Sequence, residues 1–400
     1  MSNRINNIKS DFPIFNQSNL VYLDSAATTQ KPYSVLKATE SLYIEANANV
    51  HRAIYSIGIE ATNRFEKARE KVARFINAPS SKEVVFTGGA TESLNLLASS
   101  LVSRLKPGDE ILLSEMEHHS NIVPWQMMAA KFDIKIKYLP IDKNGELDLS
   151  ESEKYFTKDT KVVSITHISN VLGTINPIEE LAKKTHEVGA IFISDGAQGA
   201  PHMKIDVQKI GCDFYVFSGH KMLGPTGSGV LWGKTKLLEE LDPFMGGGEM
   251  IKSVSFEKST WNDIPYKFEA GTPNIAQAVG LGAAVDYLES IGMDNIQKHE
   301  KTLTDYALEK IGKIEGLRIH GSSENRSGVI SFNIKGIHPQ DLAQFLDQDN
   351  IAIRVGHHCA QPLLNILNET SSARVSLYIY NNESDIDKFC ESITKIKAYF

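Results

Sequence analysis

Short apolar runs that alternate with helical segments are the feature that most limits the fold of this chain. They cover residues 83–87, 109–114, 135–139, 161–166, 190–194, 213–217 and 229–232. Helical periodicity separates several of them, over 94–105, 117–131 and 178–188. Buried strands that alternate with helices are typical of a mainly parallel sheet with helices on both faces. We therefore expect an α/β fold.

The pattern changes after residue 244. Residues 245–273 are expected to be irregular, and the long helix 274–291 connects them to the C-terminal part of the chain. That part mixes helices and strands, with helices at 293–311, 339–348 and 384–397 and strands at 328–332 and 374–378. This mixture predicts a second, smaller domain of the α/β or α+β class. We place the large domain at residues 20–290 and the small domain at 1–19 and 291–400.

Polar residues stand at the ends of the predicted strands, where ligands bind in parallel sheets. The turn Gly88-Gly89-Ala90-Thr91 opens a helix, and its free N–H groups could hold an anion, although for this turn alone helix capping is the preferred explanation. His118 follows another strand and could be structural. Asp195 follows the run 191–194, where a buried carboxylate needs a cation or several hydrogen bonds. A protonated heterocyclic nitrogen would meet that need.

Lys221 lies in Ser-Gly-His-Lys (218–221), directly after the apolar run 213–217. Lysine is seldom buried unless it is paired or reactive. Burial lowers its pKa, and a neutral amine is required to form a Schiff base with a carbonyl cofactor. Taken by itself, this stretch is equally consistent with a surface lysine in a tight turn. The neighbouring strand ends, with Asp195, Thr91 and His118, favour the organic cofactor.

Charge and composition exclude several other classes. The net charge of −7 and the pI of about 6.0 give no attraction for nucleic acid or an anionic membrane. No apolar run approaches the roughly 20 residues of a membrane span, and the first residues lack a signal-peptide pattern. Three cysteines (Cys212, Cys359 and Cys390) are too few for a disulfide framework, so we expect a reducing cytoplasm. Neither a metal-ligand spacing nor a GxSxG hydrolase motif is present.

Together these motifs resemble a known family. The segments 195–198 (Asp-Gly-Ala-Gln) and 218–221 resemble the signature of class V, fold-type I enzymes that use pyridoxal 5'-phosphate (PLP). The segments 354–362 (RVGHHCAQP) and 373–376 (ARVS) resemble those of group II, Suf-type cysteine desulfurases. The resemblance extends from about residue 11 to the C-terminus. It implies a PLP-dependent homodimer with L-cysteine as substrate.

The resemblance also implies the cofactor contacts. Lys221 would hold the cofactor covalently and later move the Cα proton of the substrate. Asp195 would pair with the ring nitrogen, Gln198 would bind the ring oxygen, and His118 would stack on the ring and take part in proton transfer. The phosphate would be bound by Ala90 through its N–H, by Thr91, Ser218 and His220, and by Thr272 of the neighbouring subunit. Many relatives carry threonine at position 90, so a hydroxyl contact is lost here while the N–H remains.

For the substrate, the resemblance implies that Arg374 binds the carboxylate through two parallel hydrogen bonds. Lysine performs this bidentate role less well. Asn170 would bind the same carboxylate or the ring oxygen. Arg354 and Ala26 complete the predicted substrate-binding set.

Cys359 determines the reaction that the resemblance implies. Its thiolate would attack the substrate sulfur and keep it as a persulfide, and His357, His358 and Arg354 would favour the thiolate. An accessory acceptor protein of the Suf type would then receive the sulfur for iron–sulfur cluster assembly. A selenocysteine lyase and a non-catalytic, partner-binding dimer are the two alternatives. A small buried cysteine is the plainer interpretation, which suits Cys212 and Cys390 better.

Overall fold

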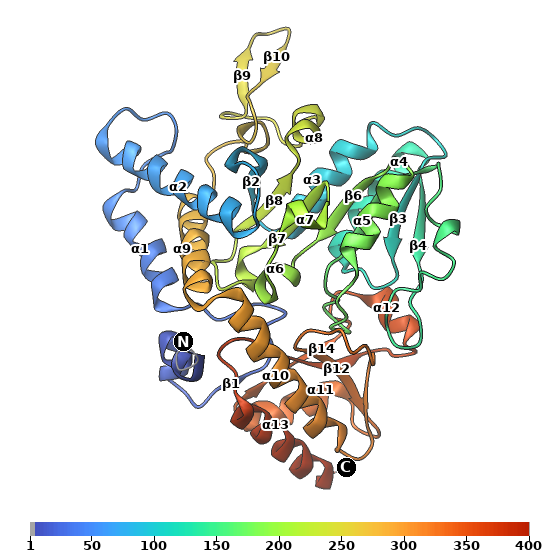
Figure 1. The fold of residues 1–400 in the computed structure, drawn as a ribbon. Helices are drawn as coiled ribbons and strands as arrows, with labels where there is room; N and C mark the ends of the chain where they lie inside the picture. Colours follow the sequence, from blue (N-terminus) through green and yellow to red (C-terminus); the bar gives the residue numbers. More distant parts are fainter. Residues whose placement is uncertain (1–4, 400) are drawn as a thin grey trace.

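A seven-stranded sheet forms the centre of the computed structural model, which describes residues 5–399 (Figure 1). In spatial order its strands are β2 (Val84–Thr87), β8 (Gly229–Gly233), β7 (Phe214–Ser218), β6 (Ile191–Asp195), β5 (Thr160–Thr166), β3 (Glu110–Ser114) and β4 (Lys135–Leu139). β8 runs antiparallel to both of its neighbours, and all other pairs are parallel. The predicted mainly parallel α/β sheet is confirmed.

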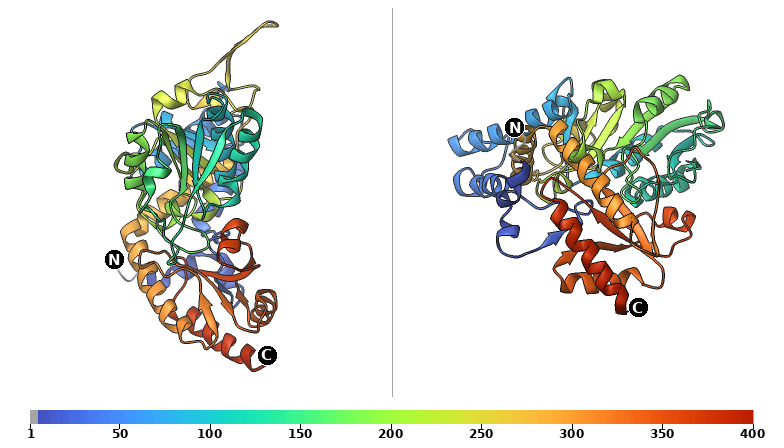
Figure 2. Two further views of the ribbon diagram at one scale, coloured as in Figure 1. Left: turned by 90° about the vertical axis from the view of Figure 1, so that its right-hand side faces the viewer. Right: turned by 60° about the horizontal axis from the view of Figure 1, so that its bottom comes forward.

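Helices cover both faces of this sheet, as the edge-on view in Figure 2 shows. Successive residues of β3 point to opposite faces, so Ile111 and Leu113 join one core while Leu112 joins the other. The first core includes α3 (Ala90–Val102) and α4 (Val123–Phe132). The opposite core includes α2 (Ser56–Phe75), α5 (Ile178–Glu187), α7 (Val207–Ile210) and α9 (Ile275–Ile291). Burial on both faces explains why these strands are apolar throughout.

A second, four-stranded sheet lies below the first in Figure 1. Its order is β11 (Leu317–Ile319), β12 (Val329–Ile334), β15 (Ser372–Ser376) and β14 (Arg354–Gly356), and every pair is antiparallel. The helices α10 (Met293–Gly312), α11 (Pro339–Gln348) and α13 (Glu383–Ile396) share its core. The short α12 (Gln361–Ile366) and α6 (Gly199–His202) lie nearer the first sheet.

The N-terminal segment reaches this second core as well. Strand β1 (Val21–Tyr22) pairs in parallel with β13 (Ile351–Ala352), and Leu23 is buried among the small-sheet residues. The domain boundaries at 20 and 290 stay a prediction. Residues 1–4 and 400 of the predicted small domain lie outside the described residues.

The expectation of an irregular stretch over 245–273 is wrong in part. A hairpin of β9 (Ile251–Val254) and β10 (Ser259–Trp261) projects from the top of the molecule in Figure 1. Nearly all of its residues are exposed, so the alternation of buried and exposed residues that identifies a strand is missing from its sequence. Helices α1 (Tyr33–Glu45) and α8 (Thr235–Glu240) were likewise not predicted.

Within residues 5–399, none of the helices combines the length and the apolar character needed to cross a membrane.

A buried ion pair fixes the segment after the hairpin. Both terminal nitrogens of Arg69 in α2 bind the carboxylate of Glu269, at 2.6 and 2.9 Å. Arg69 also donates to the Val84 carbonyl, while Glu269 accepts from the Phe86 N–H at 2.7 Å. The two side chains are only 1% and 3% exposed. The pair therefore joins α2, β2 and the start of the 269–274 segment.

We expect Arg69→Met to destabilise the protein by about 3–5 kcal/mol, because it leaves the Glu269 carboxylate buried without a cation. Urea denaturation measures this loss as a fall in the free energy of unfolding. The control is Arg74→Met. The ion pair between Arg74 and Glu289 is exposed, so its loss should lower the free energy of unfolding by less than about 1 kcal/mol. Equal losses in the two variants would contradict the prediction.

Candidate active site

One cavity of about 240 Å³ collects the polar residues that stand at the strand ends. All the predicted site residues except Thr272 line it: Ala26, Ala90, Thr91, His118, Asn170, Asp195, Gln198, Ser218, His220, Lys221, Arg354, Cys359 and Arg374. Nine of these thirteen come from the carboxyl ends of β2, β3, β5, β6 and β7 or the segments that follow them. Arg354, Cys359 and Arg374 come from the second sheet and its loops. The cavity therefore lies between the two cores.

Lys221 and Asp195 form the polar centre of this cavity. Asp195 is the last residue of β6, and Lys221 ends a short 3₁₀ helix after the adjacent strand β7. Burial raises the pKa of Asp195, whose Oδ1 accepts from the Ala197 N–H at 2.9 Å. Desolvation lowers the pKa of Lys221 to about 8, with Asp195 opposing the shift. Among the described residues, none forms a hydrogen bond with the Lys221 amine.

His118 lies just after β3 and is uncharged at neutral pH. Burial, reinforced by Lys221 and other cations, lowers its pKa to about 3. Its Nδ1 accepts from the Ser120 N–H at 3.1 Å, so the ring hydrogen resides on Nε2. Next to it, Glu117 is fully buried and accepts from Ser114, Thr166 and Asn121.

This support for His118 was not predicted from the sequence. Asn121 also accepts from Trp125 at 2.9 Å and from Ser164 at 2.6 Å, which ties the segment to α4 and β5. Burial raises the pKa of Glu117 to about 8. The signal available in the sequence was the acidic residue directly before His118, at the end of an apolar strand.

The turn for which the sequence predicts an anion site lies at the N-terminus of α3. The Ala90 N–H points at Ser218 and donates to its Oγ at 2.9 Å. Gly89 has φ +154°, and a Cβ there would lie 3.4 Å from the same oxygen. His220 Nδ1 lies 3.2 Å from Thr28 Oγ1. The turn thus brings the N-terminus of α3 to the end of β7, close to Lys221, with the Ala90 N–H bound to Ser218 in this structure.

Arg374 is held in place from two sides. It is 1% exposed, and its terminal nitrogens donate to Asp24 Oδ1 at 2.9 Å and to the Asn170 carbonyl at 3.0 Å. Its Nε has no hydrogen-bond partner in the described part of the chain. Asp24 was not among the predicted site residues, because it lies 350 positions from Arg374 in the sequence. The guanidinium keeps N–H donors free for an anion in the cavity.

Cys359 lies in a four-residue loop between β14 and α12. Its Sγ is 3.7 Å from a terminal nitrogen of Arg354, the cation that was expected to favour the thiolate. The expectation that His358 also favours the thiolate is wrong. Burial lowers the pKa of His358 to about 2, and its Nε2 pairs with Ser372 Oγ at 2.9 Å. An uncharged imidazole that faces a serine cannot act as a cation for the sulfur.

Thr272 lies apart from the other predicted residues. It lines a separate cavity of about 160 Å³ together with Gly88, Glu92 and Met245. Its expected role at the phosphate of the neighbouring subunit stays a prediction.

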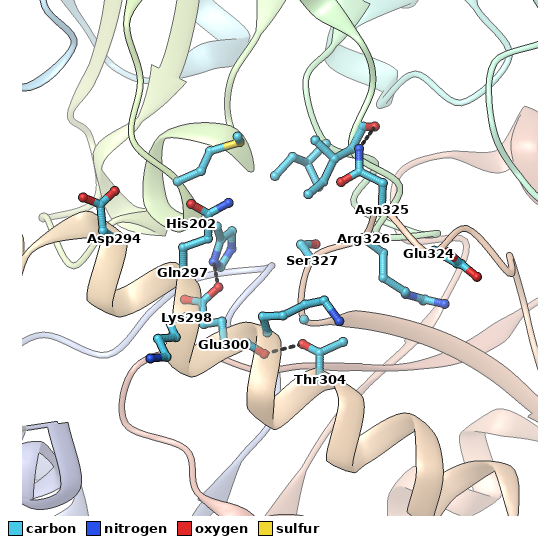
Figure 3. Close-up of a pocket in the computed structure, with 15 residues that line it drawn as sticks. His202, Asp294, Gln297, Lys298, Glu300, Thr304, Glu324, Asn325, Arg326 and Ser327 are labelled. Atoms are coloured by element: carbon cyan, nitrogen blue, oxygen red, sulfur yellow. Dashed lines mark hydrogen bonds and ion pairs between the residues drawn. The ribbon is translucent and has the colours of Figure 1, made fainter. Parts of the chain in front are cut away.

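Another cavity, of about 430 Å³, lies between α10 and the loops below the large sheet (Figure 3). Its buried wall contains a pair between His202 Nδ1 and Glu300 Oε2 at 2.8 Å, with Thr304 bound to the Glu300 carbonyl. The pair joins α6 to α10. Neither Lys221 nor Cys359 lines this cavity, so it is distinct from the candidate active site. In the described residues, no group of three or more His, Cys, Asp and Glu side chains is arranged to hold a metal ion.

Comparison with known proteins agrees with this geometry. The model of the "Aminotransferase class-V" family matches residues 21–389. The chain belongs to this family. The match includes both sheets and every predicted site residue, from Ala26 to Arg374.

Two curated relatives match over nearly the full length. A "Probable cysteine desulfurase" from Halalkalibacterium halodurans is 52% identical over 98% of both chains. A protein of the same name from Streptomyces coelicolor is 49% identical over 98% of this chain and 97% of its own.

Two solved structures agree in fold. The cysteine desulfurase CsdA (S-sulfonic acid) from Escherichia coli is 38% identical, covers 99% of both chains and has a TM-score of 0.93. The apo cysteine desulfurase from Thermococcus onnurineus is also 38% identical, with a TM-score of 0.95 over 99% of this chain and 98% of that one. The predicted fold-type I architecture is confirmed.

Proposed function

We propose that this protein is a PLP-dependent cysteine desulfurase that converts L-cysteine to L-alanine and keeps the sulfur on Cys359. The observation that carries the proposal is the single cavity that contains Lys221, Asp195, Arg374 and Cys359. These side chains supply an amine, a buried carboxylate, a carboxylate-binding guanidinium and a thiol. The names of the relatives and the class-V membership support the same activity.

The residues present fit PLP. The Lys221 amine has no partner among the described residues, and the nearby buried Asp195 carboxylate suits a protonated ring nitrogen. Gln198 donates to the Ala26 carbonyl at 2.8 Å, while its Oε1 has no partner in the described chain and remains available to a ligand. The N-terminus of α3 suits a phosphate. When bound, PLP supplies a ring that accepts electrons from the substrate carbon.

The side chains of the cavity bind the substrate and move its proton. The free N–H groups of Arg374 bind the L-cysteine carboxylate, and Asp24 and Asn170 keep the guanidinium in place. Lys221 takes the proton from the substrate Cα, because desolvation has lowered its pKa into the range where the amine can act as a base. His118 stays uncharged and offers a flat ring face.

Cys359 performs the sulfur transfer. Its thiolate forms an S–S bond with the substrate sulfur while the C–S bond breaks. The electron pair left on the substrate carbon takes up a proton, which yields L-alanine, and the persulfide stays on Cys359. Cys359 and Lys221 line the same cavity of about 240 Å³, so both groups can reach one small substrate.

We assign the protein to the group II, Suf-type branch, which the four-residue loop around Cys359 supports. In this role an accessory acceptor protein collects the sulfur for iron–sulfur cluster assembly. A reducing cytoplasm is proposed because all three cysteines are free.

The proposed active form is a homodimer. Exposed large apolar residues gather on α1, at the start of α2 and on the β9–β10 hairpin: Tyr43, Ile44, Ile54, Tyr55, Ile57, Val254, Phe256 and Trp261. Monomeric proteins seldom leave so much apolar surface uncovered. Thr272 is placed in this dimer at the phosphate of the neighbouring subunit.

The direct test is to incubate the purified, cofactor-loaded protein with L-cysteine and a thiol reductant. We expect L-alanine and sulfide in equal amounts, with many turnovers per protomer. The same assay with L-selenocysteine compares kcat/KM for the two substrates. A protein without cofactor, or one that forms no alanine, would overturn the proposal. A large preference for selenocysteine would favour the lyase instead.

A further inference from the structure

His119 contacts the loop of Cys359 at two points. Its backbone N–H donates to the Cys359 carbonyl at 2.7 Å. Its imidazole Nε2 accepts from the Gln361 N–H at 2.9 Å. Gln361 is the first residue of α12, so the imidazole satisfies one of the free N–H groups at that helix start. One residue of the large-sheet side thus holds the chain immediately before and after Ala360.

The loop needs such support because its backbone is strained. His358 and Cys359 have φ values of +51° and +57°, in the left-handed region that residues with a Cβ disfavour. A residue with a Cβ keeps this conformation only where its surroundings hold it there. Asn170 Nδ2 donates to the His358 carbonyl at 2.7 Å, and the His358 ring pairs with Ser372. These contacts hold residue 358, whereas His119 holds residues 359 and 361.

The imidazole can accept this hydrogen bond only when it is neutral. Burial, with a smaller contribution from His357, lowers the pKa of His119. The His118 ring, at 6.3 Å between ring centroids, is uncharged as well. At neutral pH, therefore, His119 Nε2 is an acceptor.

We propose that His119 is a positioning residue that holds the Cys359 backbone in its left-handed conformation and thereby keeps the thiol in place for attack. This inference rests on the proposed function. It concerns the sulfur-transfer step alone, because His119 does not line the cavity of Lys221. Loss of the imidazole releases the start of α12, so Cys359 can leave the strained conformation.

The test compares His119→Ala and His119→Gln in the cofactor-loaded full-length protein. We expect His119→Ala to lower kcat roughly tenfold, with KM for L-cysteine within about twofold of the wild type, because a displaced nucleophile loses its orientation. Iodoacetamide should label Cys359 several-fold faster, as measured by mass spectrometry with Cys390 as the internal reference. In His119→Gln the new Oε1 can accept from the Gln361 N–H. Both kcat and the rate of Cys359 labelling should therefore lie close to their wild-type values.

His338→Ala is the matched control. The His338 imidazole also accepts a backbone N–H at a helix start, from Gln340 of α11 at 3.2 Å, away from the cavity. It should leave kcat and Cys359 labelling unchanged. The proposal is overturned if His119→Ala behaves like the wild type, if His119→Gln is as impaired as His119→Ala, or if the visible absorption of the cofactor changes.

The two proposals fail in different ways. If the protein does not act on L-cysteine, the proposed function fails, yet the labelling rate of Cys359 still reports on the His119 contacts. If the wild type is active and His119→Ala matches it in kcat and labelling, the positioning role fails alone.

Discussion

Replacing Lys221 with alanine is expected to remove both the visible absorption of the purified protein and all measurable turnover of L-cysteine. The amine attaches the cofactor and also acts as the base at the substrate Cα, so a loss of at least about 10³-fold in kcat is expected. Absorption spectra and alanine production measure the two effects. Lys234→Ala is the control, because that lysine binds Asp213 at the partly exposed end of β8. A coloured, active Lys221→Ala protein would refute the assignment.

The lowered pKa of Lys221 gives this prediction a pH dependence. Only the unprotonated amine reacts with a carbonyl group, and its pKa is about 8 instead of the usual 10.5. PLP uptake by cofactor-free protein should therefore quicken as the pH rises, with the midpoint of the increase near pH 8. Because Asp195 raises the pKa of this amine, Asp195→Asn should move the midpoint to lower pH. A midpoint near 10 in the wild type would contradict the desolvated environment.

Cys359→Ser is expected to keep the cofactor absorption of the wild type but to lose sulfide release from L-cysteine by about 10³-fold. The hydroxyl is a far weaker nucleophile than the thiolate and cannot carry a persulfide. Cys390→Ser is the control, because burial raises the pKa of that thiol to about 11 and it lies on α13, away from the cavity. Undiminished sulfide release would remove Cys359 from the mechanism.

Cys359→Ser should affect the turnover of L-cysteine and of L-selenocysteine to different extents. Selenium leaves carbon more readily than sulfur, so selenocysteine turnover depends less on the thiol. Retained activity of Cys359→Ser towards selenocysteine would not by itself identify a lyase. The wild-type kcat/KM for both substrates, measured beside it, decides the matter.

Much of the site could be predicted because a parallel sheet places the carboxyl ends of its strands along one edge. Asp195 and Lys221 each come at or just after the end of a strand, so the fold itself brings them together. The contacts that were missed join distant segments. Asp24 reaches Arg374, and Arg69 reaches Glu269 across 200 residues. A local pattern contains no information about such pairs.

Two further errors have physical causes. The sequence shows three imidazole or guanidinium groups near Cys359, but it does not show that His358 points at Ser372 in a dry environment. The hairpin β9–β10 has no buried face, so its sequence lacks the periodicity of a strand. The charge of His358 and the pattern of the hairpin both depend on solvent exposure, which is a property of the folded chain.

The pairing of β1 with β13, and of Asp24 with Ser376, has a consequence for biosynthesis. A ribosome adds roughly 5–20 residues per second, so the segment around Asp24 waits about 20–70 s before its partners have been made. During that time Leu23 has no core to enter, and Arg374 does not yet exist to be held. The substrate-binding corner is therefore among the last parts of the nascent protein to form. A newly made chain stays inactive until residues 374–376 have left the ribosome.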